Sequence, residues 1–106
     1  FRGARYIHVL VPCPLGWGHG SAETIKMARL AQETALFPVF EAEHGEVKHV
    51  SKIRRQLPVE DYLKPQSRFA HLFKPPGHSD LVARIQALAD RNVQRFGLVG
   101  DAEDAP

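Results

Sequence analysis

The sequence predicts a small α/β fold whose order is strand, loop, helix, strand, short hairpin, extended arm and terminal helix. A β-rich run near the start ends at a proline and is followed by a glycine-rich loop and then by apolar residues at helical spacing. Near the other end, a longer helical pattern ends at a glycine. The chain of 106 residues is 43% hydrophobic and 25% charged, which suits one domain with a modest core.

The first element is predicted from the segment Arg5 to Val11, which is rich in β-branched and aromatic residues and ends at Pro12, as a buried strand would. The loop after it contains Cys13. Ser21 is suited to cap the following helix, with Glu23 in its first turn. The apolar stripe of this helix is expected to consist of Ile25, Ala28, Leu30, Ala31 and Ala35.

A hairpin is predicted next. The segment Phe37 to Glu43 has the composition of a strand, His44 to Glu46 that of a turn, and Val47 to Ser51 that of a third strand. Pro38 lacks a backbone N–H, so the second strand either lies at a sheet edge or begins after this residue.

The second half is predicted to contain a basic, proline-punctuated arm from Lys52 to Pro76, with a short helical turn at Val59 to Lys64. We expect this arm to lie against a neighbouring surface. A terminal helix is expected to begin near Ser79 and to end at Gly97. The acidic tail, residues 100–106, is expected to be disordered. The apolar positions of the terminal helix are Leu81, Val82, Ile85, Leu88, Ala89, Val93 and Phe96.

Composition excludes several classes of function. A formal charge of +2 is too small for a general nucleic-acid binder, and the longest nearly apolar run, Tyr6 to Val11, is too short to span a bilayer. We identify no membrane segment or signal peptide, and the single cysteine cannot form an internal disulfide, so a cytoplasmic protein is expected. Because Phe1 is not methionine and the first strand follows almost at once, we interpret the chain as the C-terminal piece of something longer. The alternative is a small protein with a processed end.

The stretch V-P-C-P-L-G-W-G-H-G, Val11 to Gly20, contains the chain's only cysteine between two prolines. One interpretation is a metal or cluster ligand, because the prolines stiffen the loop and the glycines let backbone N–H groups approach the sulfurs of a cluster. An iron–sulfur cluster needs four ligands. Three would therefore have to come from outside this chain.

Three other interpretations of this stretch remain open. Cys13 could be a small buried hydrophobic residue, the commonest fate of a lone cysteine. It could be a nucleophile with His19 as base, although no acidic partner lies nearby in sequence. Gly16-x-Gly18 could belong to a dinucleotide site with Glu41 or Glu43 as the ribose partner, although Ser21 replaces the third glycine; glycines that only allow close packing are the simpler explanation.

Other polar groups offer weaker candidates. His44 and His49 could face each other across the hairpin, but without a third ligand we interpret them as surface residues. Arg68 and Phe69 could serve a subunit interface or pack an arm against its own domain. A basic run could receive an acidic electron carrier, although a solvated edge is the simpler reading. The run consists of Lys48, His49, Lys52, Arg54 and Arg55.

Several segments resemble one family. The segment Tyr6 to Trp17, Y-I-H-V-L-V-P-C-P-L-G-W, is similar to the β subunit of 2-oxoacid:ferredoxin oxidoreductases, particularly the pyruvate type. Glu23 to Glu33 resembles the helix that follows the Pro-Cys loop in this family, and Phe37 to Glu41 its next strand. Pro58 to Phe69 resembles its terminal V-x-x-Y-L-x-x-Q-x-R-F segment. Together these cover most of residues 5–73 in the family's order.

The resemblance implies the C-terminal portion of a thiamine diphosphate-binding domain. Enzymes of the family oxidatively decarboxylate a 2-oxoacid and join the acyl group to coenzyme A, using thiamine diphosphate, Mg²⁺ and iron–sulfur clusters, with ferredoxin or a similar acceptor. The resemblance further implies that Cys13 is the fourth ligand of the four-iron four-sulfur cluster nearest the thiamine. It also implies that Trp17 helps to shield this cluster from water. The partners implied are the remainder of the β subunit and the other subunits, with no nucleic acid and no membrane.

The sequence also departs from the family pattern. Leu15 stands where the family usually has threonine, and the N-terminal cysteines and the Gly-Asp-Gly…Asn segment that holds Mg²⁺ and diphosphate are absent, so this chain alone cannot bind either cofactor. We therefore expect residues 1–75 to be part of the thiamine diphosphate-binding domain, 76–99 a terminal helical extension and 100–106 a disordered tail. The alternative is a stand-alone small α/β binding module with a structural cysteine.

Overall fold

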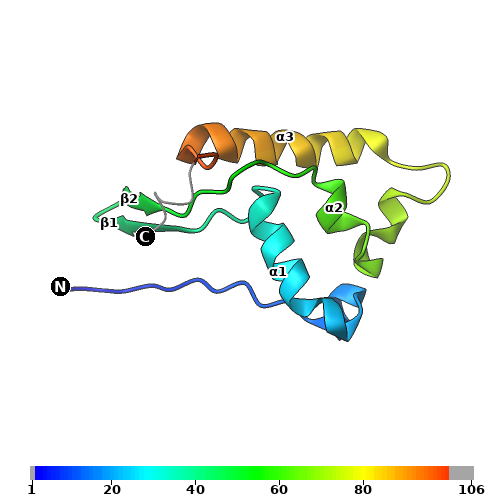
Figure 1. Ribbon diagram of the computed structural model, residues 1–106, viewed down its shortest axis with the longest axis horizontal. Helices are drawn as coiled ribbons and strands as arrows, with labels where there is room; N and C mark the ends of the chain where they lie inside the picture. Colours follow the sequence, from blue (N-terminus) through cyan, green and yellow to red (C-terminus); the bar gives the residue numbers. More distant parts are fainter. Residues whose placement is uncertain (1, 101–106) are drawn as a thin grey trace.

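The computed structural model describes residues 2–100 and is a small α/β arrangement with one two-stranded antiparallel sheet. Figure 1 shows a long helix, α3, lying across the hairpin and the shorter helices. The helices are α1 (Thr24–Glu33), α2 (Glu60–Leu63) and α3 (Ser79–Phe96), and the strands are β1 (Phe40–Glu43) and β2 (Glu46–Val50). Three tight helical turns complete the elements: η1 (Pro14–Gly18), η2 (Ser21–Glu23) and η3 (Ser67–Leu72).

The predicted buried strand from Arg5 to Val11 is wrong for this chain. The segment is extended but belongs to no strand, and Tyr6 and Ile7 are each 86% exposed. Figure 1 shows it, in blue, as an extended segment that leads away from the helices beside the hairpin. A strand needs a neighbouring strand to bond its backbone groups, and the only sheet among residues 2–100 is the β1–β2 pair.

Helix α1 forms where the helical spacing predicts it, but its start differs from the prediction. Ser21 begins the turn η2, and no side chain caps α1. Instead Thr24 Oγ1 donates a hydrogen bond to the Ser21 carbonyl oxygen at 3.0 Å. The predicted stripe is correct at Leu30, Ala31 and Ala35, whereas Ile25 and Ala28 are exposed and Met27 is fully buried in their place.

The hairpin is confirmed. β1 begins at Phe40, after Pro38, and pairs with β2 in the register Phe40↔Val50 and Glu43↔Glu46. Two residues with positive φ, His44 at 52° and Gly45 at 80°, form the turn, as the twist of a two-residue hairpin requires.

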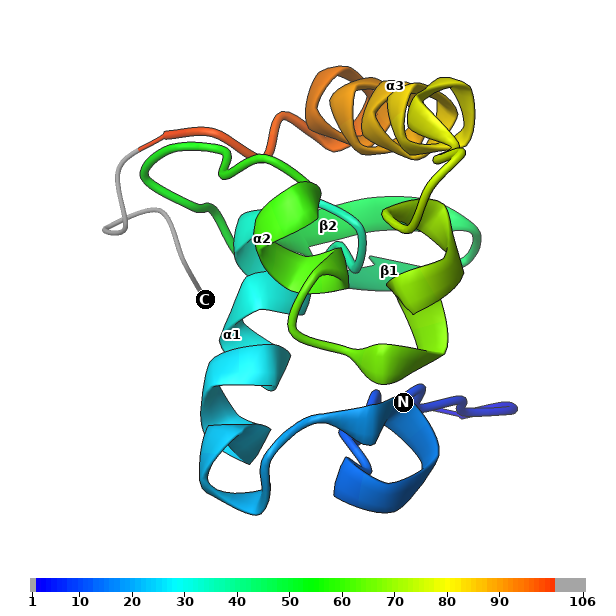
Figure 2. The same cartoon turned by 90° about the vertical axis from the view of Figure 1, so that its right-hand side faces the viewer.

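The arm from Lys52 to Pro76, which we expect to lie against a neighbouring surface, packs against other segments of its own chain. The predicted helical turn forms as α2, and Val59 and Leu63 are almost fully buried. Ile53 N–H donates to the Leu98 carbonyl at 2.7 Å, and Gly100 N–H donates to the Ile53 carbonyl at 3.0 Å. The arm is therefore joined to the segment that follows α3, as Figure 2 shows from the side.

Helix α3 begins and ends where the sequence predicts, and Gly97 ends it with a left-handed φ of 61°. Gln86 Oε1 accepts a hydrogen bond from Val59 N–H at 3.0 Å, and Asn92 Nδ2 donates to the Ala35 carbonyl at 2.8 Å. The Phe96 ring stacks on Phe40, with centroids 4.9 Å apart. Thus α3 contacts the Lys52–Pro76 segment, the end of α1 and the hairpin. The expected disordered tail lies, apart from Gly100, outside the described residues.

The buried apolar residues form one cluster between α1, α2 and α3. Half-buried side chains pack around it, among them Leu10, Trp17, Phe69 and Phe96. The buried members are Met27, Leu30, Ala31, Ala35, Ile53, Val59, Tyr62, Leu63, Leu72, Val82, Ala89 and Leu98.

Replacing Met27 by alanine should lower the free energy of unfolding by about 2–5 kcal/mol, because Met27 is 0% exposed and truncation leaves a cavity. Leu88, on α3, is 52% exposed and provides a control: Leu88→Ala should cost less than about 1 kcal/mol. Urea unfolding followed by circular dichroism measures both. Equal losses would show that α1 does not pack as described.

Candidate functional site

The loop after Cys13 folds into the turn η1, Pro14–Gly18, and Cys13 is the extended residue directly before this turn. Trp17 N–H donates to the Cys13 carbonyl at 2.8 Å, and Gly16 N–H donates to Cys13 Sγ at 3.4 Å. Cys13 itself is exposed. The interpretation of Cys13 as a buried hydrophobic residue is therefore wrong, and the sulfur is available to an external group while holding a backbone N–H donor.

The structure requires glycine at position 18 of this loop but not at position 16. Gly18 has a φ of 75°, and a Cβ on it would lie only 2.9 Å from Ser67 Cβ. The loop and η3 therefore approach each other more closely than any side chain at Gly18 would allow. A Cβ on Gly16 would meet only Cys13 Sγ, at 3.5 Å, which is an ordinary contact.

Trp17 is held by the segment that contains η3. The guanidinium carbon of Arg68 lies 4.1 Å from the centre of the Trp17 ring, and Tyr62 meets the ring edge-on at 6.2 Å. Arg68 in turn donates to Gln66 Oε1 at 2.7 Å and to the Tyr62 hydroxyl at 3.3 Å. We call this set the Trp17 cluster: Trp17, Tyr62, Gln66, Arg68 and Phe69.

The Trp17 cluster gives the polar positions of the V-x-x-Y-L-x-x-Q-x-R-F segment a physical role. Gln66 is fully buried and donates from Nε2 to the Tyr62 carbonyl at 2.6 Å, which leaves its Oε1 directed at Arg68. Figure 2 shows the turn η1, in blue, beside the green segment of residues 66–72. Of the two open interpretations of Arg68 and Phe69, local packing within this chain is the one observed. Tyr62 and Gln66 were missed as partners of the loop, because spacing does not reveal contacts between segments about fifty residues apart.

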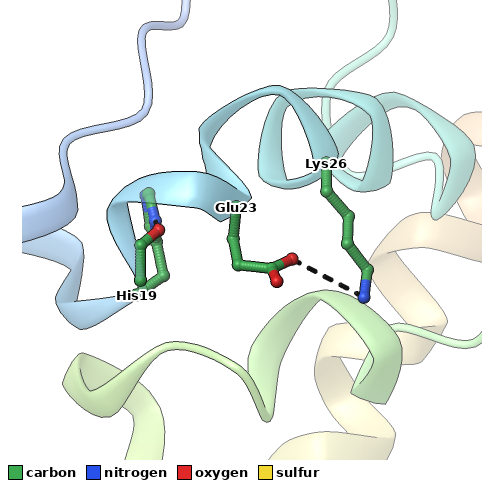
Figure 3. Close-up of polar contacts among 4 residues, drawn as sticks. His19, Glu23 and Lys26 are labelled. Carbon is green, nitrogen blue, oxygen red and sulfur yellow. Dashed lines mark hydrogen bonds and ion pairs between the residues drawn. The ribbon is translucent and has the colours of Figure 1, made fainter.

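His19 does not form a catalytic pair with Cys13. Its side chain is buried, and Nδ1 lies 2.8 Å from the Gly20 carbonyl oxygen; because this oxygen can only accept, Nδ1 carries the proton. Nε2 is buried and has no hydrogen-bond partner among the described residues. Figure 3 shows Glu23 directed toward Lys26, 3.7 Å from it, and not toward His19. Within residues 2–100 no acidic side chain bonds the imidazole and His19 bonds no atom of Cys13, so the nucleophile interpretation lacks both of its required contacts there.

The dinucleotide interpretation also fails. Glu41 and Glu43 lie exposed on β1, which pairs with β2 alone. The strand–helix–strand unit of a dinucleotide site needs two parallel strands, and within residues 2–100 the first of them has no partner.

His44 and His49 do not face each other across the hairpin. The register sets His49 opposite Glu41, while His44 lies in the turn. Lys48 bonds its own strand neighbour Glu46 at 2.9 Å. Lys52, Arg54 and Arg55 line a hollow of about 390 Å³ beside the end of α1.

The structure places no group of metal-binding side chains with Cys13 within residues 2–100. Across residues 2–100, no three His, Cys, Asp or Glu side chains come together in a group that could hold a metal ion. The described part of this chain therefore offers one cysteine sulfur and not a complete site. In the same part of the chain, no helix combines the length and apolar character needed to cross a membrane.

Comparison with known proteins finds relatives for nearly the whole chain. It is 46% identical to pyruvate synthase subunit PorB of Methanosarcina barkeri over 96 residues, which are 91% of this chain and 32% of that subunit. It is 40% identical to the PorB subunit of Methanocaldococcus jannaschii over 92% of this chain and 31% of that subunit. Ketoisovalerate oxidoreductase subunit VorB of Pyrococcus abyssi matches at 40% over 68% of this chain and 24% of that subunit.

The resemblance to 2-oxoacid oxidoreductase β subunits is thus confirmed, over a chain that spans about a third of the length of these relatives. No family model matches the chain. Because the M. barkeri match covers 96 of 106 residues, it includes α3, which ends at Phe96.

Replacing Gly18 by alanine should disturb the loop, because the positive φ costs roughly 1–2 kcal/mol and Ser67 must also move. Gly16→Ala is the matched control, since its Cβ meets no close neighbour. Emission of Trp17, the only tryptophan, and urea unfolding report both changes. The described contact with Ser67 is refuted if the two variants behave alike.

Replacing Arg68 by lysine should lower the free energy of unfolding by about 1 kcal/mol and shift the Trp17 emission, because lysine keeps the charge but loses the planar stack and the bond to Gln66. Arg91→Lys on the exposed side of α3 is the control and should change neither. An unchanged spectrum in Arg68→Lys would mean that Arg68 does not hold Trp17.

Proposed function

Because this chain belongs with the β subunits of 2-oxoacid:ferredoxin oxidoreductases, matching about a third of their length, we propose that it is part of such a subunit and that Cys13 is an iron–sulfur ligand. The observation that supports this role is the exposed Cys13 Sγ at the start of a tightly held loop. The match to the oxidoreductase subunits and the exposed sulfur of Cys13 together favour an iron–sulfur cluster. Neither observation alone would support this proposal.

The chemistry of the loop fits a thiolate ligand. Gly16 N–H already points at Sγ, and backbone N–H donors to sulfur stabilise the charged thiolate and tune the potential of a bound cluster. Proline on each side limits the motion of Cys13. The remaining three ligands would come from the part of the subunit outside this chain.

Trp17 is proposed to line one side of the iron–sulfur site. Arg68 covers one face of its ring, and the rings of His19 and Tyr62 make T-shaped contacts with it, so the ring is fixed in orientation. A fixed aromatic surface next to the cysteine would limit the access of water, which affects the redox potential of a cluster.

A four-iron four-sulfur cluster would supply one-electron transfer away from the reacting carbon. Thiamine diphosphate with Mg²⁺ is proposed for the same complex, with Mg²⁺ held by residues outside this chain, since within residues 2–100 no three His, Cys, Asp or Glu side chains form a group that could hold the ion. The role of this chain is then to hold one cluster ligand and to form part of the subunit that surrounds the thiamine.

The proposed reaction is the oxidative decarboxylation of a 2-oxoacid to its acyl-coenzyme A, with ferredoxin or a similar protein accepting the electrons. Pyruvate is proposed as the substrate, because the relatives matched over most of this chain are named pyruvate synthase subunits. A VorB subunit named for ketoisovalerate also matches, so a branched 2-oxoacid is the alternative substrate. Lys52, Arg54 and Arg55, near the end of α1, are a candidate binding surface for an acidic electron carrier such as ferredoxin.

The alternative of a stand-alone binding module with a structural cysteine has less support. A structural cysteine should be buried, whereas Cys13 is exposed. The long exposed apolar arm is also unusual for a self-contained module.

Replacing Cys13 by alanine in the assembled oxidoreductase should remove one cluster: iron content should fall by about four atoms per subunit or the cluster should degrade to a smaller form. Pyruvate-dependent reduction of ferredoxin should then fall at least about a hundredfold. Iron analysis and electron paramagnetic resonance measure the first effect directly.

Leu15→Ala is the control, because Leu15 lies in the same loop and is 96% exposed. It should retain the full iron content. Full iron content and an unchanged resonance signal in Cys13→Ala would overturn the assignment of Cys13 as a ligand.

A further inference from the structure

The outer face of α3 carries a line of positively charged side chains. Arg84, Arg91 and Arg95 are exposed, and Leu88, which lies between the first two, is 52% exposed. Because successive residues of an α-helix are turned by about 100°, these four positions lie within about 60° of one another around the helix axis. The buried residues of α3 face the core from the other side of the helix. We call this set the arginine stripe: Arg84, Leu88, Arg91 and Arg95.

The cations of the other two α-helices have partners on their own helix or directly before it. Lys26 pairs with Glu23 at 3.7 Å at the start of α1, and Lys64 pairs with Glu60 at 3.2 Å on α2. Within residues 2–100, none of the three arginines of the stripe forms an ion pair. The longest helix therefore presents positive charge that the described part of the chain does not neutralise.

The two acidic residues of α3 are engaged elsewhere. Asp90 accepts hydrogen bonds from Gln56 at 2.9 Å and from Gln86 at 3.0 Å, so it faces the Lys52–Pro76 segment. Asp80 lies in the first turn of α3, where the helix dipole stabilises a carboxylate. Neither carboxylate therefore explains the arginines that follow along the outer face.

The stripe contributes little to the stability of its own helix. Arg91 and Arg95 lie one turn apart, and like charges at this spacing destabilise a helix. Arg95 alone has an internal contact, over the Phe96 ring at 5.1 Å. Arg84 and Arg91 have no hydrogen bond, ion pair or ring contact among the described residues. Unpaired arginines around an exposed leucine indicate a surface that contacts another molecule.

The chemistry of the stripe fits carboxylates on a protein surface. α3 contains arginine but no lysine, and the planar guanidinium binds a carboxylate through two parallel hydrogen bonds. Leu88 and the exposed Ala87 provide an apolar centre between the charges, as in protein interfaces, where arginine is enriched and lysine is depleted. A nucleic acid is a poorer fit, because the formal net charge of the chain is only +2.

We infer that the arginine stripe is the docking surface for an acidic face of another subunit of the same complex. This inference rests on the proposed function for the existence of that complex. The partner would present carboxylates about 10 Å and about 6 Å apart, which are the distances along α3 from Arg84 to Arg91 and from Arg91 to Arg95. A helix with Asp or Glu at the same spacing on one face meets this requirement.

A subunit fits the stripe better than a soluble electron carrier does. Figures 1 and 2 show α3 on the opposite side of the molecule from the turn η1, which follows Cys13. A carrier bound to α3 would be held away from the proposed iron–sulfur ligand, whereas a structural subunit has no need to lie near it. The exposed Leu88 also suits a lasting interface, because permanent interfaces bury more apolar surface than transient ones.

Charge reversal in the full-length subunit tests the inference. Replacing Arg84 and Arg91 together by glutamate should reduce the amount of the other subunits that co-purify with it at least about tenfold, because the acidic face is then repelled. Arg29→Glu combined with Lys74→Glu makes the same change in net charge at exposed positions outside the stripe and is the matched control. The control should co-purify like the unchanged subunit. Equal co-purification from the two double variants would overturn the inference.

Cross-linking in the assembled complex identifies the partner without reversing any charge. Arg84→Lys and Arg91→Lys provide amines that a carbodiimide joins directly to a carboxylate in contact, and mass spectrometry locates the link. A link to Asp or Glu of another subunit is expected, and Arg29→Lys, the control, should not link to the same carboxylates. A link only to residues 101–106, to a second copy of this chain or to added ferredoxin would overturn the inference, as would no link at all.

The results separate this inference from the proposed function. A complex that reduces ferredoxin with a 2-oxoacid, and that assembles normally with Arg84 and Arg91 replaced by glutamate, would refute the docking surface alone. Loss of an acidic partner on charge reversal, in a full-length protein without this activity, would refute the oxidoreductase function and leave the docking surface standing.

Discussion

The contact between Trp17 and Arg68 is the interaction on which the candidate site depends. The arginine stacks on the indole at 4.1 Å and is itself oriented by Gln66 and Tyr62, whose segment is anchored in the core through Val59, Leu63 and Leu72. The core holds the segment that contains Tyr62 and Gln66, and these two residues hold the guanidinium of Arg68. The guanidinium in turn holds the indole of Trp17 in one orientation. Because Trp17 N–H bonds the Cys13 carbonyl, the orientation of the cysteine follows from a core that lies mostly on other elements.

Local signals predicted those elements whose partners lie inside the chain. The hairpin follows from its turn residues, and the end of α3 at Gly97 follows from the need for a left-handed residue there. The boundaries of α2 and α3 are set by backbone preferences and by one apolar face, and both are local properties. The position of Cys13 on a loop was predicted for the same reason, since Pro12 ends the extended segment before it.

The predictions that failed depended on contacts that the sequence does not display. Residues 6–11 have the composition of a buried strand, but burial requires a sheet, and residues 2–100 provide none for this segment. Ser21 has the right chemistry for a cap, yet a tight turn places Thr24 Oγ1 on the Ser21 carbonyl. The Trp17–Arg68 stack joins positions about fifty residues apart, and only the folded chain reveals that they meet.

The two parts of the chain near Cys13 differ in how they are held, and this difference bears on how a cluster site could form. On its C-terminal side the loop is fixed by Gly18 against Ser67 and by the Trp17 cluster. On its N-terminal side it continues into the extended segment of residues 6–11, in which His8 meets Phe37 and Leu10 packs against the core. A thiolate that is oriented from one side but not located from the other cannot complete a four-ligand site alone. The three ligands proposed to come from the rest of the subunit would fix the second side, so assembly of the subunit and formation of the iron–sulfur site would be coupled.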